Sequence, residues 1–368
     1  MNNNIKPFSV LIKALILFAA INVLYGLVEP PIAEVSVYNN IFPGLKRMPF
    51  GISADPYTVT VDNVDAMFAA HEISAQKQPD EIRVALIGDS SIWGESLPVK
   101  DTLAGQWNQQ ALQCGDKKIR FYNLGYPHPS IIKDLIFIDE TNERQPDVIV
   151  WFVTLNTLMN QFRLHPFVIE NRERALQIMI TYDIPFAPRR ALEEEADSFY
   201  DRTLMGQRTF LARWLKLQSL GLIRSATGTD LIVPPQHLES LAHDVKKNPN
   251  YRDLEPGTDL RVYLLLNALT AGYSLAGETP ILLVNEPIFV ANGQNSAIRY
   301  NDLYPRWAYD QYRDLVAAQA QASTWDYLDL WNAIPPDYFT DTPMHVNAEG
   351  ERLLIEQITP SLLSMVCH

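Results

Sequence analysis

Short apolar runs alternate with longer amphipathic stretches along most of this chain. Runs bounded by Gly, Pro, Asn or Asp predict buried strands at 82–87, 119–124, 148–155, 280–285 and 326–330. Stretches with apolar positions three or four residues apart predict helices at 102–112, 131–140, 260–274, 309–322 and 353–366. Alternation of this kind is typical of a parallel sheet with helices on both faces. The pattern therefore predicts a three-layer α/β fold.

Residues 8–28 form one long apolar segment that differs from everything after it. It carries a single charge, Lys13, and about 20 apolar residues suffice to cross a bilayer as a helix. Because Lys6 and Lys13 lie at its start while Glu29 and Glu34 follow it, the positive-inside rule predicts a cytoplasmic N-terminus and an extracytoplasmic remainder. A cleavable signal peptide is the alternative, although no small-residue cleavage site follows the segment cleanly.

The spacing of these elements predicts three parts. Residues 1–30 form the anchor, 31–80 a membrane-proximal stalk with a leading helix at 61–74, and 81–368 the α/β domain. More than one hundred residues separate the third strand from the fourth, far more than one crossover needs, so we expect an insertion at about 160–258.

The insertion contains a basic amphipathic helix at 209–224 and a polar segment, 234–256, that predicts a surface loop. The helix either packs on the domain, or forms a lid or a membrane-surface helix.

Composition narrows the class of protein. A hydrophobic share of 47% and an aromatic share of 10% suit a packed globule. A net charge of −13 with no basic stripe argues against nucleic acid as a partner. No Cys/His spacing typical of zinc and no Gly-rich phosphate loop is present, so we expect no metal or organic cofactor.

Two polar segments carry the candidate chemistry. Gly88-Asp89-Ser90 directly follows the first predicted strand, and ligands of open α/β sheets bind at the carboxyl ends of the strands. The alternative for this tripeptide is a simple helix cap. His345 lies in a Pro- and Asn-containing loop before the last predicted helix, at the same sheet edge. A serine needs a base such as neutral His to lose its proton, and Asp341 could orient that ring.

These segments resemble the SGNH (GDSL-type) hydrolase family over about residues 80–160 and 280–368. The resemblance implies a flavodoxin-like parallel sheet of the SGNH hydrolase type, with Ser90 as nucleophile and His345 as base. It also implies an oxyanion hole made of the Ser90 and Gly125 backbone N–H groups and the Asn156 side chain.

The chain departs from the family pattern at two blocks. Thr154 and Thr157 replace the usual Gly and Asp around Asn156. Asp341 stands four residues before His345 instead of three, so it reaches the ring only if the loop bulges; otherwise a Ser–His dyad results. Two residues that flank the blocks, Trp93 and His128, are weaker candidates for substrate contact, the alternatives being a core aromatic and a surface histidine.

The resemblance implies a serine esterase that acts on acyl esters, most simply O-acetyl esters, at the cell envelope. The first alternative is an O-acyltransferase that modifies an envelope polysaccharide beside a membrane-bound O-acyltransferase, as anchored family members do. The second is a non-catalytic scaffold with decayed motifs. Cys114 is expected at the end of the helix after the first strand and Cys367 at the end of the last helix. In a flavodoxin-like winding these two helix ends are neighbours, which predicts a disulfide, with two unpaired thiols as the alternative.

Overall fold

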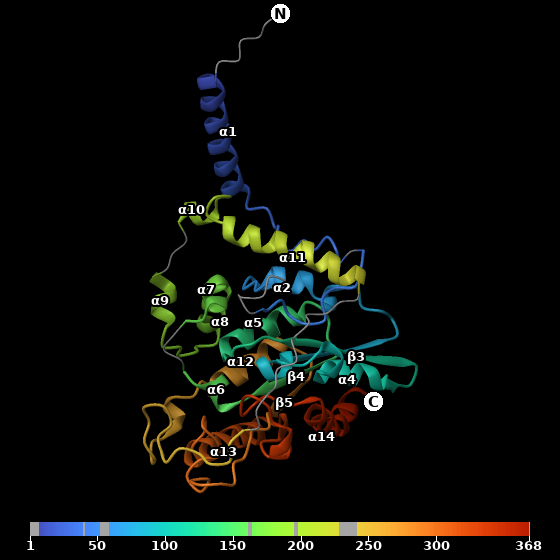
Figure 1. The fold of residues 1–368 in the computed structure, drawn as a ribbon, viewed down its shortest axis with the longest axis vertical. Helices are drawn as coiled ribbons and strands as arrows, with labels where there is room; N and C mark the ends of the chain where they lie inside the picture. Colours follow the sequence, from blue (N-terminus) through green and yellow to red (C-terminus); the bar gives the residue numbers. More distant parts are fainter. Residues whose placement is uncertain are drawn as a thin grey trace, which may run out of the picture.

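The computed structural model describes residues 7–39, 41–51, 59–160, 164–194, 198–227 and 241–367. Its centre is a six-stranded sheet with the order β2-β3-β1-β4-β5-β6 (Figure 1). The strands are β1 (Glu81–Gly88), β2 (Gln113–Cys114), β3 (Lys117–Gly125), β4 (Val148–Val153), β5 (Ile281–Asn285) and β6 (Asp326–Asp329). Every pair is parallel except β2 with β3. The predicted α/β class and its five parallel strands are confirmed, and the short antiparallel edge strand β2 is an addition.

Alternation along β1 explains the three layers. Val84 and Leu86 contribute to a core shared with α4 (Leu103–Gln110) and α14 (Ala348–Val366). Ala85 and Ile87 contribute to a core on the other side, and the helices there are α5 (Ile131–Asn142), α12 (Leu266–Ala276) and α13 (Arg306–Ser323). All eight residues of β1 are buried, as expected of a central parallel strand that is covered on both faces.

The segment expected as a stalk is instead part of the domain where the structure describes it. The side chains of Tyr38, Met48 and Phe68 are fully buried in the main hydrophobic core. The leading helix is shorter than predicted, α2 (Val64–Ala70), followed by the 3-10 turn η1 (Glu72–Ser74). Arg47 donates from Nη1 to the carbonyl oxygen of Gly94, 3.0 Å away, and so ties this segment to the turn after β1.

Short helices fill the predicted insertion. They are α7 (Pro166–Glu170), α8 (Arg172–Thr181), α9 (Arg189–Glu194), α10 (Phe199–Arg202) and α11 (Arg208–Thr227). The predicted helix 209–224 lies within α11. Of the predicted surface loop, residues 234–240 lie outside the described residues, and 241–256 contain no helix. The remaining short elements are α3 (Ser90–Trp93), α6 (Leu155–Leu158), η2 (Val99–Asp101), η3 (Leu260–Val262) and η4 (Pro336–Tyr338).

The N-terminal helix α1 (Pro7–Val28) projects from the rest of the molecule (Figure 1). Within the described part of the chain it is the one helix long and apolar enough to cross a bilayer. Its Phe8, Leu17 and Leu24 side chains are exposed, which distinguishes it from a buried core helix.

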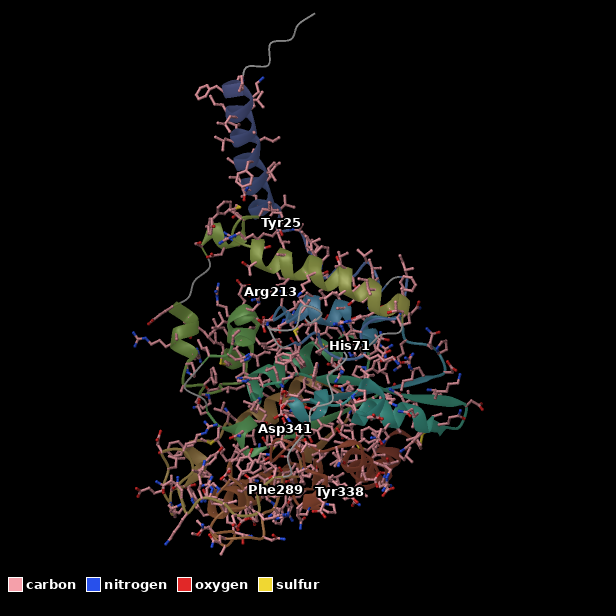
Figure 2. The ribbon with its side chains drawn as sticks, viewed as in Figure 1. Tyr25, His71, Arg213, Phe289, Tyr338 and Asp341 are labelled. Atoms are coloured by element: carbon pink, nitrogen blue, oxygen red, sulfur yellow. A yellow bond between two sulfur atoms is a disulfide. The ribbon has the colours of Figure 1, made fainter. Side chains whose placement is uncertain are left out.

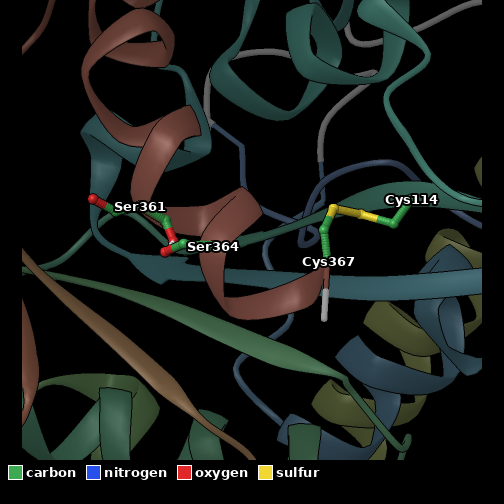
Figure 3. Close-up of a disulfide and its surroundings, with 4 residues drawn as sticks. All are labelled: Cys114, Ser361, Ser364 and Cys367. Carbon is green, nitrogen blue, oxygen red and sulfur yellow. Dashed lines mark hydrogen bonds between the residues drawn. A yellow bond between two sulfur atoms is a disulfide. The ribbon is translucent and has the colours of Figure 1, made fainter.

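Cys114 and Cys367 form a disulfide with their Cα atoms 5.3 Å apart (Figure 3). The predicted pairing is therefore present, although Cys114 lies on β2 and not at the end of a helix. Helices α4 and α14 pack side by side as expected, and Trp107 Nε1 donates to Thr359 Oγ1 at 3.0 Å between them.

Candidate active site

Ser90 stands where β1 turns into the short helix α3. Asp89 is the N-cap of that helix and accepts a hydrogen bond from Ser91 N at 3.1 Å. The cap predicted as the alternative role of Gly88-Asp89-Ser90 thus exists, but it is made by Asp89 and leaves Ser90 at the first helical position. The backbone N–H groups of a first helical turn have no acceptor within the helix, so Ser90 lies beside potential anion donors.

His345 is positioned by the loop that leads into α14. Asn347 caps this helix and accepts from Glu349 N and Gly350 N at 3.1 and 3.0 Å. The backbone N–H of Phe289, in the segment after β5, donates to Pro343 O at 2.8 Å. The loop is therefore held from both sides, and the imidazole of His345 is largely buried.

The predicted pair meets across the sheet edge. His345 Nε2 lies 2.8 Å from Ser90 Oγ, and His345 Nδ1 lies 3.0 Å from Asp341 Oδ1. Residues 341–344 form a turn that absorbs the extra residue of this motif, so Asp341 reaches the ring from four positions away. Three side chains from two distant segments thus form a continuous Ser–His–Asp chain of hydrogen bonds.

Charges around the ring favour a basic imidazole. Burial alone would lower the pKa of His345, but the hydrogen bond and charge of Asp341, with the charge of Glu95, outweigh it and raise this pKa. Glu95 Oε2 lies 3.8 Å from His345 Nε2. The hydrogen bond from His345 lowers the pKa of Asp341 to about 2. Asp341 is therefore ionised at neutral pH and can stabilise an imidazolium.

Gly125 ends β3 beside the catalytic turn and pairs in register with Gly88. A Cβ at Gly125 would lie 2.3 Å from Trp93 N, so only glycine allows β3 to approach α3 this closely. Its N–H donates to Asn123 Oδ1 at 3.0 Å. The structure therefore places the Gly125 N–H on an acceptor in its own strand, which differs from the expectation of a donor aimed at the oxyanion.

Asn156 lies in α6, at the carboxyl end of β4. Tyr251 Oη donates to its side-chain oxygen at 2.7 Å, and Arg252 Nη2 does so at 3.3 Å. The replaced residues Thr154 and Thr157 form a reciprocal capping box over α6, so the altered motif still makes an ordered turn. Because its oxygen is the end held by Tyr251, the amide of Asn156 has a fixed orientation.

Neither weak candidate for substrate contact has direct contact with the catalytic groups in the part of the chain that the structure describes. Trp93 is buried in the core: its indole N–H donates to Met48 O at 2.9 Å, and Arg47 lies over its ring. His128 stacks on His165 with ring centroids 3.7 Å apart. Burial, and then the neighbouring His165, lower the pKa of His128 to about 3, so the stacked pair is neutral. Trp93 is thus the core aromatic that the sequence left open as an alternative.

A buried acidic side chain under the catalytic turn has no counterpart in the sequence analysis. Glu286 follows β5, and its Oε2 lies 2.5 Å from Ser91 Oγ. The same hydroxyl lies 3.1 Å from Asp89 Oδ1. Burial, and then the charge of Asp89, raise the pKa of Glu286 well above its ordinary value. A single Glu after a strand forms no spaced motif. The position of Glu286 at a strand end is therefore the only signal for it in the sequence.

Lys133 is a second residue that the sequence analysis did not select. Its buried ammonium donates to Gly88 O at 2.6 Å and to Tyr126 O at 3.1 Å, and pairs with Asp134 at 3.0 Å. It thereby holds the ends of β1 and β3 together at the site. The available signal was a charged Lys-Asp pair in the otherwise apolar start of α5.

A cavity of about 760 Å³ lies elsewhere, at the junction of α1 and α11 with the domain. Its lining includes Tyr25, Asp62 and Arg213 but neither Ser90 nor His345. Among the described residues no group of three or more His, Cys, Asp or Glu side chains is placed to hold a metal ion.

Comparisons with known proteins give similarity only at the level of structure. No family model matches the chain, and no curated protein matches it in sequence. One similar structure is a lipolytic G-D-S-L family member from Veillonella parvula, at 10% identity, with 76% of this chain and 96% of that chain covered and a TM-score of 0.36. Another is a carbohydrate acetylesterase family member from Sinorhizobium meliloti, at 13% identity, 77% and 98% coverage and a TM-score of 0.33. A third is the aryl esterase of M. smegmatis, at 12% identity, 77% and 99% coverage and a TM-score of 0.36.

Proposed function

We propose that this protein is a serine esterase that hydrolyses acyl esters, most simply O-acetyl esters, at the cell envelope. The observation that carries the proposal is the chain of hydrogen bonds from Ser90 through His345 to Asp341, with distances of 2.8 and 3.0 Å. Residues 255 positions apart have no structural need to align a hydroxyl, an imidazole and a carboxylate in this order. A nucleophile needs a base within reach and a base needs an orienting group, and both requirements are met.

In this mechanism His345 Nε2 accepts the Ser90 proton as Ser90 Oγ attacks the ester carbonyl carbon. Asp341 holds the ring and stabilises the imidazolium. The tetrahedral oxyanion lies near the N-terminal turn of α3, with the Asn156 amide as a further donor. Collapse breaks the bond to the alcohol, which takes the proton from His345. Water, deprotonated by His345, then releases the acid from Ser90 and restores the free enzyme.

We assign the Gly125 N–H to the oxyanion only in the substrate complex. Its present acceptor is the side-chain oxygen Asn123 Oδ1 and not a backbone carbonyl, so rotation of the Asn123 side chain on substrate binding would free this N–H. Without that rotation the site has two donors instead of three. Donors of this kind are each worth roughly 3 kcal/mol of transition-state stabilisation.

Envelope location is proposed on two features. Helix α1 is apolar and largely exposed, with Asn22 and Gly26 buried at its foot, and the Cys114–Cys367 disulfide suits an oxidising compartment. With Lys6 and Lys13 on the cytoplasmic side, the domain would lie outside the membrane, held through residues 8–28. A membrane O-acyltransferase partner and a polysaccharide acceptor belong to the transferase alternative. The same acyl-Ser90 intermediate serves both reactions, since they differ only in whether water or a sugar hydroxyl takes the acyl group.

The test combines a covalent probe with an acceptor assay. A fluorophosphonate should label the full-length protein on the peptide that contains Ser90, and the label should be absent from Ser90→Ala. Hydrolysis of p-nitrophenyl acetate should show the same dependence on Ser90. Acetate as the sole product when a polysaccharide is present supports the esterase, whereas acetylated polysaccharide would establish the transferase. No labelling and no turnover would overturn both and leave a non-catalytic scaffold.

A further inference from the structure

The foot of α1 is fixed to the insertion by specific contacts. Gly26 packs on Phe199 of α10, with space there for no more than a tightly placed Cβ. The polar contacts at this junction are Tyr25 Oη to Gln207 Oε1 (2.9 Å), Met205 N to Asn22 Oδ1 (2.9 Å) and Arg202 Nη1 to Glu29 Oε1 (2.8 Å). Helix α1 is therefore held against α10 and the start of α11, and is not joined to the domain by a free linker.

The chain after α1 then runs along α11. Val37 N donates to Gln218 Oε1 at 2.8 Å, and Trp214 Nε1 donates to Val35 O at 3.2 Å. On the inner side of α11, Gly221 is so close to the ring of Tyr38 that a Cβ would lie 2.2 Å from it. Trp214, Gln218 and Gly221 follow one another at four- and three-residue spacing, so this one face of α11 is held by the chain that follows α1. In Figure 1, α11 lies crosswise below the foot of α1.

The outer side of α11 has the composition of an interfacial helix. The helix contains four basic residues and no Asp or Glu, in a protein of net charge −13. Several of its exposed positions lie along one face of the helix, among them Arg208, Ala212, Leu215, Lys216, Ser219 and Ile223. Leu215 is 58% exposed and Ile223 57%. Large aliphatic and basic side chains on one exposed face of a helix are the combination typical of a helix that lies in a membrane interface.

Further apolar side chains are exposed in the segments that contact α11 or follow α1. They are Val35, Val37, Ile41, Phe199, Tyr200 and Met205. We call these residues, together with the outer side of α11, the juxtamembrane face.

We infer that the juxtamembrane face rests on the surface of a phospholipid bilayer that contains anionic headgroups, with α11 in the plane of the interface. The inference rests on the proposed insertion of α1. A helix of 22 residues is about 33 Å long, which matches the roughly 30 Å of hydrocarbon it would cross. A bilayer around α1 necessarily ends at its foot, where α11 begins. Leu215 and Ile223 would enter the interface, and Arg208 and Lys216 would lie near lipid phosphates.

This placement gives the domain one orientation. In Figure 2, Tyr25 lies at the foot of α1 and Asp341 lies in the half of the molecule farther from α1. The catalytic groups then lie in the half of the domain farther from the anchoring bilayer, which favours esters beyond its surface over those of its own lipids.

The test uses single cysteines in the full-length protein, because Cys114 and Cys367 are paired and an introduced thiol is the only free one. Leu215→Cys and Ile223→Cys carry an NBD fluorophore, and the protein is reconstituted in nanodiscs of phosphatidylcholine and phosphatidylglycerol. The matched control is Val262→Cys in η3, which is 74% exposed and far from α1 in sequence and structure. Quenching is measured with lipids that carry a doxyl group near the top of the acyl chain, and separately with aqueous iodide.

We expect doxyl lipids to quench the probes at 215 and 223 several-fold more than the probe at 262, and iodide to show the reverse order. Equal iodide access at all three positions would overturn the inference, since the face would then be open to water. Shielding from both quenchers would also overturn it and indicate that a protein covers the face. Protein recovered free of lipid would overturn the membrane attachment of α1 and the juxtamembrane face together. Turnover of p-nitrophenyl acetate, measured on the same samples, reports separately on the proposed esterase.

Discussion

Ser90 and Ser91 are adjacent in the chain, yet their hydroxyls lie in two different regions. The first region contains Ser90, His345 and Asp341. The second contains Ser91, Glu286 and Asp89. Ser90 Oγ lies 2.8 Å from the basic nitrogen of His345, whereas Ser91 Oγ lies 2.5 Å from the buried carboxyl of Glu286. One region raises the pKa of a base, and the other raises the pKa of an acid well above its ordinary value. The Gly-Asp-Ser-Ser sequence therefore does not distinguish the two serines by itself. The partner that each hydroxyl contacts across the sheet distinguishes them.

The largest expected effect separates the two serines directly. Ser90→Ala removes the nucleophile, and we expect kcat for p-nitrophenyl acetate to fall on the order of 10⁶-fold, as when the serine of a triad is removed. The free energy of unfolding should change little, because Ser90 is partly exposed and loses one hydrogen bond.

Ser91→Ala is the matched control for that experiment. We expect it to keep kcat within roughly tenfold but to destabilise the fold by about 1–3 kcal/mol, because Glu286 Oε2 loses its partner inside the protein. A larger loss of kcat in Ser91→Ala than in Ser90→Ala would reverse the assignment of the two regions.

Asp341→Asn tests why the first region is basic. The carboxylate of Asp341 raises the pKa of His345, whereas burial lowers it. His345 accepts a proton only when neutral, so kcat/KM rises with pH through the pKa of His345. We expect Asp341→Asn to lower the plateau of kcat/KM by roughly 10³–10⁴-fold. The acidic limb should also move to lower pH, because the raising influence is gone.

A pH profile of kcat/KM on both proteins measures the two effects separately. A lower plateau with an unmoved acidic limb would mean that Asp341 orients the ring without setting its pKa. Unchanged values of both would favour the Ser–His dyad that the sequence left open.

The sequence predicts the first region, around Ser90 and His345, far better than the second, around Glu286. Ser90 and His345 could be paired because each follows or precedes a long periodic element, and parallel strands end at one edge. Asp341 remained open because the extra residue had to be absorbed by a turn at 341–344, and loop conformation has no periodic signal. Glu286 and Lys133 were missed because a single polar residue near an apolar run becomes informative only when its burial is known.

The same distinction explains the errors in the fold. The five parallel strands are long enough to show a continuous apolar run, but β2 has only two residues. The stalk was wrong where the structure describes it, because the turn-rich segment at 41–51 buries single large side chains such as Met48. Trp93 was offered as a pocket residue on its position next to a motif. Its indole packs under Arg47, a contact between segments that no local pattern predicts.

Asn156→Ala tests whether Asn156 belongs to the first region. If the Asn156 amide donates to the oxyanion, we expect kcat to fall on the order of 10²–10³-fold with KM nearly unchanged. The control is Tyr251→Phe, which removes the hydroxyl that holds the Asn156 oxygen at 2.7 Å and should give a smaller loss in the same direction. An unchanged kcat in Asn156→Ala would mean that Asn156 is not part of the site and is only a residue of the turn at the end of β4.

Glu286→Gln has the smallest expected effect on rate and tests the second region. A hydroxyl has one proton, so Ser91 can donate either to Glu286 or to Asp89. With Glu286 protonated, its O–H donates to Ser91 Oγ and Ser91 donates to Asp89, and a glutamine N–H can replace the first donor.

The pKa of Glu286 is raised in the folded protein, so above the ordinary pKa of a glutamate the fold binds a proton that the unfolded chain releases. The free energy of unfolding of the wild type must then fall as pH rises from about 4.5 toward the folded pKa of Glu286. The variant lacks this dependence, so its stability relative to the wild type should rise with pH by up to about 1.4 kcal/mol per pH unit.

Urea unfolding at several pH values measures this difference, with the exposed Glu278→Gln as a control that should show none. A Glu286→Gln variant whose stability follows the wild type at every pH would mean that Glu286 is ionised, and the two serines would then face regions of the same electrostatic character.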